Sequence, residues 1–175
     1  MYSSRKRCLL LATGLLVAAS SLASAAEPGS FGYGSVATPA QIAGWDIDVR
    51  GEDGAGLPPG KGTVDRGADV YAEQCAACHG TFGEGEGRFP KLVGGVGSLR
   101  DERPEPTVGS YWPYATTLYD YINLAMPFTA PQTLTPNEVY SVLAWLLFQN
   151  QIIAENAVMD AQTLPKVEMP NRNGF

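Results

Sequence analysis

Hydrophobic and polar positions repeat with a helical period in three segments of this sequence. The first segment spans residues 64–75, where four positions lie three or four residues apart and share one helix face: Gly67, Val70, Tyr71 and Gln74. Thr63 is a suitable N-cap, and Asp65 lies in the first turn. We predict a helix over residues 64–75.

Two further helices are predicted in the second half of the chain. Residues 116–125 place Leu118, Ile122 and Ala125 on one side, and the helix should end at Met126 because a residue before proline disfavours helical dihedrals. The last helix begins after Thr135 with Pro136 and the capping-box residue Glu138. Its broad apolar face consists of Val139, Val142, Leu143, Leu146 and Leu147.

The rest of the chain shows no sustained period. Residues 26–62 are rich in Gly and Pro and predict an irregular arm, residues 80–108 predict a long loop, and residues 152–175 predict an extended tail. We therefore expect one mainly α domain over residues 63–151, flanked by the arm and the tail. A loop as long as 80–108 inside a compact domain requires a reason, and a bound group beneath it would supply one.

Residues 1–25 have the pattern of a secretory signal peptide. Arg5, Lys6 and Arg7 precede an apolar run, and Ala23 and Ala25 supply the small residues of a cleavage site. The apolar run is too short for a good bilayer span, although a retained anchor is the alternative. We expect a periplasmic mature protein that has no membrane span.

The expected mature chain is strongly acidic. Cleavage after Ala25 removes three of the 12 basic residues and none of the 18 acidic residues, which leaves a net charge of −9. This charge repels nucleic acids and anionic membranes and predicts a basic surface on the partner.

Residues 75–79 contain the motif that indicates which cofactor the chain binds. Cys75, Cys78 and His79 form the C-x-x-C-H signature of covalent haem attachment. Cysteines three residues apart on a helix end can reach the two vinyl groups of one haem c, and the following histidine can then ligate the iron. A zinc site would require a fourth ligand, and a thioredoxin-like pair would require a preceding strand, which the pattern does not predict.

Elimination reduces the number of candidates for the second axial ligand of the haem iron. His79 is the only histidine, and Cys8 leaves with the signal peptide, so a methionine is favoured: Met126, Met159 or Met169. Met126 lies just after a helix and before Pro127, whereas the other two lie in the tail. A lysine ligand or an open site remains an alternative. A His/Met pair would leave no vacant iron position, so we predict single-electron transfer and no rapid binding of carbon monoxide.

Five further residues are candidates for the haem surroundings. The carbonyl of Pro90 is predicted to accept the His79 Nδ1 proton, and Leu92 to pack on the haem face. Tyr111 and Trp112, together with Tyr114, carry polar hydrogens that can reach a buried propionate, although core packing explains them nearly as well.

Gly67 and Tyr71 on the first helix are predicted to meet Trp145 on the last. A glycine allows two helices to approach closely where they cross, and the aromatic pair would stabilise the crossing.

The chain resembles the SoxD family. Residues 64–151 are similar to a class I cytochrome c domain, and more particular similarity to SoxD lies in residues 44–49, 56–60, 108–117, 120–122, 125–128, 130–132 and 169–175. The resemblance implies a class I cytochrome c fold, with haem held by Cys75 and Cys78 and ligated by His79 and Met126. Some SoxD proteins carry a second haem domain, whereas this sequence ends at Phe175 without a second C-x-x-C-H.

The resemblance also implies a partner. SoxD proteins pair with SoxC, a molybdopterin subunit that performs the sulfur chemistry, so this chain is expected to be the non-catalytic electron-transfer subunit that passes electrons to a downstream acceptor. The cytochrome subunit of sulfite dehydrogenase is similar too, which leaves sulfite as an alternative substrate of the partner. A free electron shuttle and a sensing or catalytic haem are the competing hypotheses.

Overall fold

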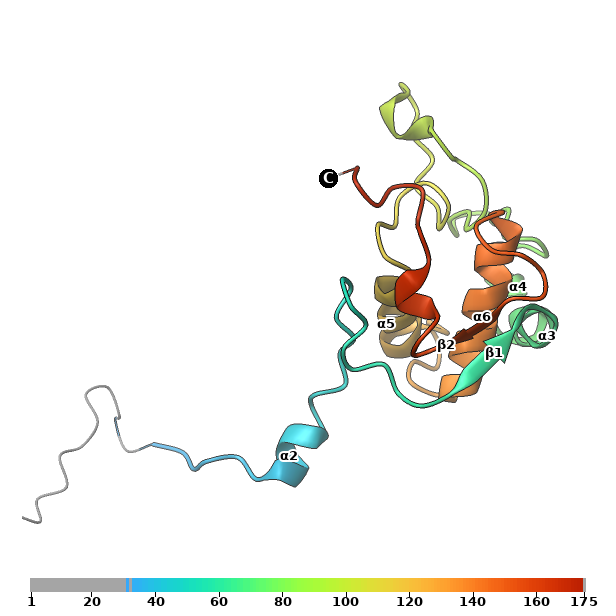
Figure 1. Ribbon diagram of the computed structural model, residues 1–175. Coiled ribbons are helices and arrows are strands. Elements are labelled where there is room, and N and C mark those ends of the chain that lie inside the picture. The colour runs from blue at the N-terminus through green and yellow to red at the C-terminus, as the bar shows by residue number, and fades with distance from the viewer. Residues whose placement is uncertain (1–30, 32, 175) are drawn as a thin grey trace, which may run out of the picture. The chain divides into compact units, whose positions relative to one another are not determined.

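The computed structural model describes residue 31 and residues 33–174 (Figure 1). The expected signal peptide lies outside the described residues. The chain divides into two compact units, residues 1–42 and residues 43–175. The elements, in chain order, are α2 (Pro39–Ala43), β1 (Lys61–Thr63), α3 (Val64–Gln74), α4 (Ala76–His79), the 3₁₀ helix η1 (Ser98–Arg100), α5 (Ala115–Ala125), α6 (Pro136–Gln149), β2 (Val158–Asp160) and the 3₁₀ helix η2 (Leu164–Lys166).

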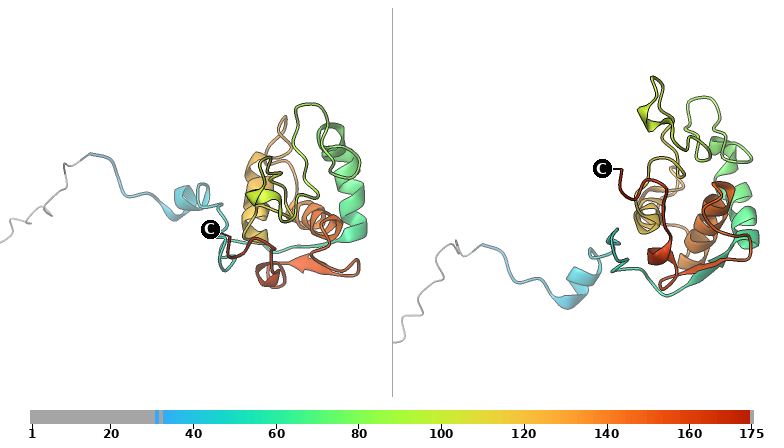
Figure 2. Two further views of the ribbon diagram at one scale, coloured as in Figure 1. Left: turned by 90° about the horizontal axis from the view of Figure 1, so that it is seen from above. Right: turned by 45° about the horizontal axis from the view of Figure 1, so that its top comes forward.

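Helix α6 is the centre of the second unit. It lies between α3 and α5 in both views of Figure 2. Every residue from 139 to 147 is buried, as expected of a helix that is covered on all sides. The predicted capping box is present, with the Thr135 side chain accepting from Glu138 N and the Glu138 side chain accepting from Thr135 N.

The predicted contact of the first and last helices is confirmed. The rings of Tyr71 and Trp145 stack with centroids 3.9 Å apart. A methyl group on Gly67 would overlap the carbonyl of Ser141 and lie 2.7 Å from Trp145 Cβ. Only glycine permits this separation of the two backbones.

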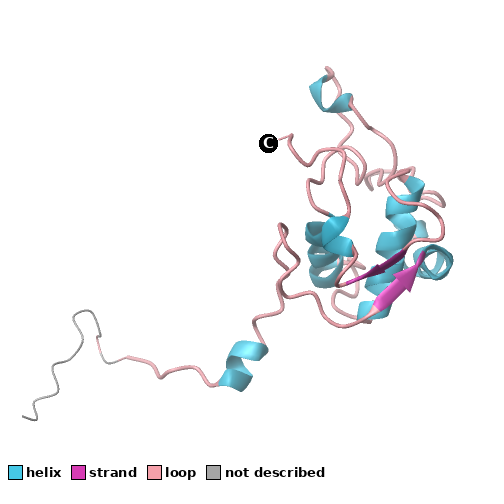
Figure 3. Ribbon diagram, in the orientation of Figure 1, coloured by secondary structure: helices cyan, strands magenta, loops and turns pink. Residues whose placement is uncertain are grey.

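A small antiparallel sheet differs from the sequence prediction, which treated both of its strands as irregular chain. Gly62 of β1 pairs with Met159 of β2, and the two strands lie side by side in Figure 3. Three-residue strands are too short to show a two-residue period, and their partners are distant in sequence. The tail beyond the sheet is also packed rather than merely extended, because Met159, Leu164 and Met169 are buried in the core.

The predicted arm changes from exposed to anchored chain at Val49. Val49 is buried, and its N–H donates to Asp120 Oδ1 at 2.8 Å. Further along, the hydroxyl of Tyr140 donates to Pro58 O at 2.9 Å. Residues from Val49 onward are therefore held by α5 and α6, whereas residues 33–48 are exposed.

Among the residues that the structure describes, none of the helices has the length and apolar character needed to cross a bilayer.

Candidate functional site

The C-x-x-C-H segment forms its own short helical turn. Cys75 caps α3, and its carbonyl accepts hydrogen bonds from Cys78 N at 3.1 Å and His79 N at 3.0 Å. Both cysteines are free and half-buried, as is His79. The turn thus gathers two thiols and one imidazole within five residues.

The His79 ring is oriented by the loop that follows it. His79 Nδ1 lies 2.9 Å from Pro90 O, the contact expected from the sequence. A carbonyl oxygen only accepts, so Nδ1 carries the proton and the lone pair resides on Nε2. The ring therefore presents one defined donor atom for a metal.

Hydrogen bonds hold this loop against α3. The hydroxyl of Tyr71 donates to Gly80 O at 2.9 Å, and burial raises the pKa of Tyr71, which keeps this donor protonated. Gly80 has a φ of +80°, a conformation that favours glycine. Gly85 N donates to His79 O and Leu92 N to Gly83 O, each at 2.7 Å. The fold of the loop thereby positions Pro90.

Asn150 is a positioning residue that the sequence reasoning missed. Its side-chain oxygen accepts from Gly94 N at 3.1 Å, and its side-chain nitrogen donates to Leu92 O at 3.1 Å and Leu146 O at 2.9 Å. It joins the end of α6 to the loop that carries Pro90. A polar residue directly after a long apolar helix face was the available signal.

Replacing Asn150 with alanine should lower the free energy of unfolding by about 2 kcal/mol. The change removes the acceptor of Gly94 N and leaves Leu92 O with Val108 N as its remaining backbone donor. Urea denaturation followed by circular dichroism measures the loss. The exposed Asn156 is the control, and its alanine variant should stay within about 0.5 kcal/mol of the wild type. Equal stabilities of the two variants would refute the bridging role of Asn150.

Three of the predicted haem residues are half-buried apolar side chains. Leu92, Trp112 and Met126 all pack against the buried core without being covered themselves. Met126 caps α5 in an extended conformation, and its N–H donates to Ile122 O at 3.0 Å. The bond between Met126 and Pro127 is cis.

The other predicted residues have different surroundings. Met159 and Met169 are buried in the core, at 4% and 3% exposure. Tyr111 is 44% exposed and lies edge-on to Trp112, while the Arg172 guanidinium lies 4.3 Å above the Tyr114 ring.

The protonation of Cys75 argues against a thioredoxin-like pair. Burial, with a contribution from Cys78, raises the pKa of Cys75 to about 11. Nucleophilic cysteines in such pairs have a lowered pKa. Within the described part of the chain, no group of three or more His, Cys, Asp and Glu side chains could hold a metal ion.

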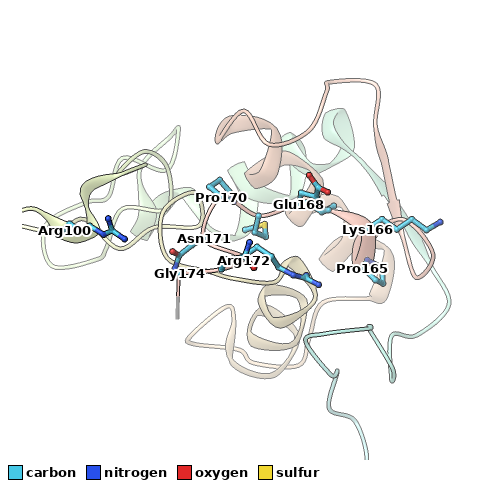
Figure 4. A pocket seen from close by; sticks show the side chains of 11 residues that line it. Arg100, Pro165, Lys166, Glu168, Pro170, Asn171, Arg172 and Gly174 are labelled. Atoms are coloured by element: carbon cyan, nitrogen blue, oxygen red, sulfur yellow. The ribbon is translucent and has the colours of Figure 1, made fainter.

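A separate polar cavity of about 700 Å³ lies along the C-terminal segment. It is lined by Arg100 and residues 165–174, and Figure 4 shows the cationic side chains of Arg100, Lys166 and Arg172 at this site. Of the residues predicted for the haem, only Met169, one of the alternative axial ligands, lines it. Its polar character does not suit a haem.

The chemistry of the predicted residues fits a haem. Two free thiols and one oriented imidazole lie in the C-x-x-C-H turn, and Met126 is a half-buried methionine packed against the core; these are the kinds of group that a covalently bound haem c requires.

Comparisons with known proteins agree with this geometry. The cytochrome c family model matches residues 64–149. A solved structure, the sulfane dehydrogenase SoxCD from Paracoccus pantotrophus, is 44% identical over 83% of this chain and 71% of that chain, with a TM-score of 0.78. This chain is a SoxD-like cytochrome c. It has the class I cytochrome c fold, carries covalently bound haem c and transfers electrons.

A second structure shares less with this cytochrome. The thiosulfate dehydrogenase TsdBA from Marichromatium purpuratum, in its as-isolated form, is 34% identical over 49% of this chain and 17% of that chain, with a TM-score of 0.37. That likeness is too low for a structural argument. No curated protein sequence matched this cytochrome significantly.

Proposed function

We propose that this cytochrome is the electron-transfer subunit of a periplasmic sulfur-oxidising dehydrogenase. A SoxC-like molybdopterin subunit performs the sulfur chemistry, and this chain receives its electrons singly and passes them to a downstream acceptor. The observation that carries the proposal is the 44% identity to SoxCD over 83% of the chain, which includes residues outside the family-model match.

The proposed ligand roles are supported by the chemistry of the site residues. Cys75 and Cys78 would hold the haem through two thioethers, and His79 Nε2 would ligate the iron because Pro90 O holds Nδ1. When bound, haem c supplies a one-electron iron couple. Met126 would supply the second ligand, since among the described methionines it is half-buried, whereas Met159 and Met169 lie within the core.

The surrounding side chains control access to this site. The half-buried Leu92 and Trp112 would limit the entry of water, and the polar hydrogens of Tyr111 and Trp112 would be hydrogen-bond donors for the two propionates. Ligation by both His79 and Met126 would leave no position for oxygen or substrate. This arrangement supports electron transfer and no chemistry on the sulfur compound.

The charge of the chain supports a protein partner. The expected mature net charge of −9 favours a partner that presents a basic docking surface, and association should therefore slow as salt is added.

Affinity purification of the tagged native protein tests the proposal. We expect a second subunit to be recovered with it and molybdenum to be present in near-equal amount, measured by mass spectrometry of metals. A cytochrome recovered alone at mature size would contradict the proposal and favour a free shuttle. Assays of the recovered complex with sulfite and with a protein-bound sulfane distinguish the two kinds of dehydrogenase.

A further inference from the structure

The segment formed by residue 31 and residues 33–48, here the arm segment, exposes large apolar side chains to an unusual extent. Four of them are almost fully exposed: Phe31 at 87%, Tyr33 at 94%, Val36 at 96% and Trp45 at 86%. Single exposed apolar residues are ordinary, but a concentration of them in so short a segment is typical of a binding site.

Helix α2 within this segment is short and has a local cap. Gln41 N donates to Thr38 Oγ1 at 3.3 Å, and Thr38 N donates to Gln41 Oε1 at 2.9 Å, which is a capping box. The helix has five residues, none of them buried. A helix of this length is unstable in water by itself, so contacts with another surface would stabilise it.

The charges of the arm segment have one sign. In residues 45–48, the apolar Trp45 and Ile47 alternate with the acidic Asp46 and Asp48. No Lys or Arg occurs between residues 31 and 49. The next cation, Arg50, is paired with Asp53 at 2.5 Å. A complementary surface would therefore be apolar with a basic rim.

The arm segment ends directly before Val49, where the chain becomes attached to the folded domain. Val49 is buried and bonded to Asp120, and Thr116 Oγ1 donates to Gly51 O. Residues immediately before Val49 are exposed. The anchored root gives the arm segment a defined starting point on the protein.

We propose that the arm segment is an anchor that docks into an apolar groove, rimmed by Lys or Arg, on the molybdenum-containing subunit. This inference rests on the proposed function. Phe31, Tyr33 and Trp45 can each bury about 150–250 Å², or about 450–750 Å² together. A standard interface buries about 800 Å² per partner, so the arm segment can supply a large part of a stable one.

Matched pairs of substitutions test the anchor. The first variant carries Phe31→Ala and Val36→Ala; its control carries Phe82→Ala and Val96→Ala, the same residue types at 66% and 63% exposure outside the arm segment. A second variant carries Trp45→Ala alone. Affinity of each purified holo-cytochrome for the molybdenum-containing subunit recovered in the purification above is measured by surface plasmon resonance.

We expect each arm variant to weaken the affinity about tenfold or more, because exposed aromatic anchors dominate interface energies. The control should stay within about twofold of the wild type. Visible spectra and melting temperatures of all variants should match the wild type, since the replaced side chains are exposed.

Three outcomes separate the proposals. Arm variants that bind as tightly as the wild type overturn the anchor alone, and so does a control that loses as much affinity as they do. If the wild type itself retains no molybdenum-containing subunit, the proposed function and the anchor both fail.

Discussion

Replacing Met126 with alanine is expected to make the reduced cytochrome high-spin and able to bind carbon monoxide stoichiometrically. The wild type should remain low-spin and bind carbon monoxide slowly or not at all at neutral pH, because the proposed ligation by His79 and Met126 would leave no vacant iron position. The variant loses the thioether sulfur, and alanine offers no replacement ligand. Visible absorption spectra of the dithionite-reduced protein, before and after addition of carbon monoxide, measure the change.

Two other methionines serve as controls for Met126. Alanine at Met159 or Met169 should leave the spectrum low-spin, while each lowers the free energy of unfolding by about 2–5 kcal/mol because both side chains are buried. A low-spin Met126→Ala protein, or a high-spin variant at either of the other positions, would assign the ligand elsewhere.

Replacing Gly67 with alanine is expected to destabilise the protein, although alanine is the better helix former. The new Cβ would overlap the Ser141 carbonyl and lie 2.7 Å from Trp145 Cβ, so α3 must move away from α6. The overlap should cost about 3 kcal/mol, well above the gain of about 1 kcal/mol that alanine gives over glycine in a helix. The free energy of unfolding in urea, followed by circular dichroism, measures the net loss of about 2 kcal/mol.

The neighbouring Ala68 provides the control for Gly67. Ala68 is exposed in the same helix, and its glycine variant should cost only the propensity difference of about 1 kcal/mol. A Gly67→Ala protein as stable as the wild type, with the Ala68→Gly protein destabilised, would show that the helices do not require glycine at their crossing.

The sequence alone determined the features that depend on neighbouring residues. The three long helices occur close to the predicted bounds, because apolar spacing, N-caps and the residue before proline act within a few positions. The C-x-x-C-H motif and the nearby Pro90 were likewise readable, since the whole arrangement from Cys75 to Pro90 lies within one loop and one turn. The meeting of Gly67 and Tyr71 with Trp145 was predictable because these residues are the small and aromatic members of two apolar faces. The ligand role of Met126 stays a prediction.

Only the tertiary structure decided the features that join distant segments. The pairing of β1 with β2, the burial of Met169, the bridge made by Asn150 and the division of the arm at Val49 each depend on contacts between residues far apart in the chain. A strand of three residues or a lone asparagine has too little local pattern to identify its partner. Such contacts form when the helices bring the segments together, and the packing of the whole domain, rather than local propensity, selects them.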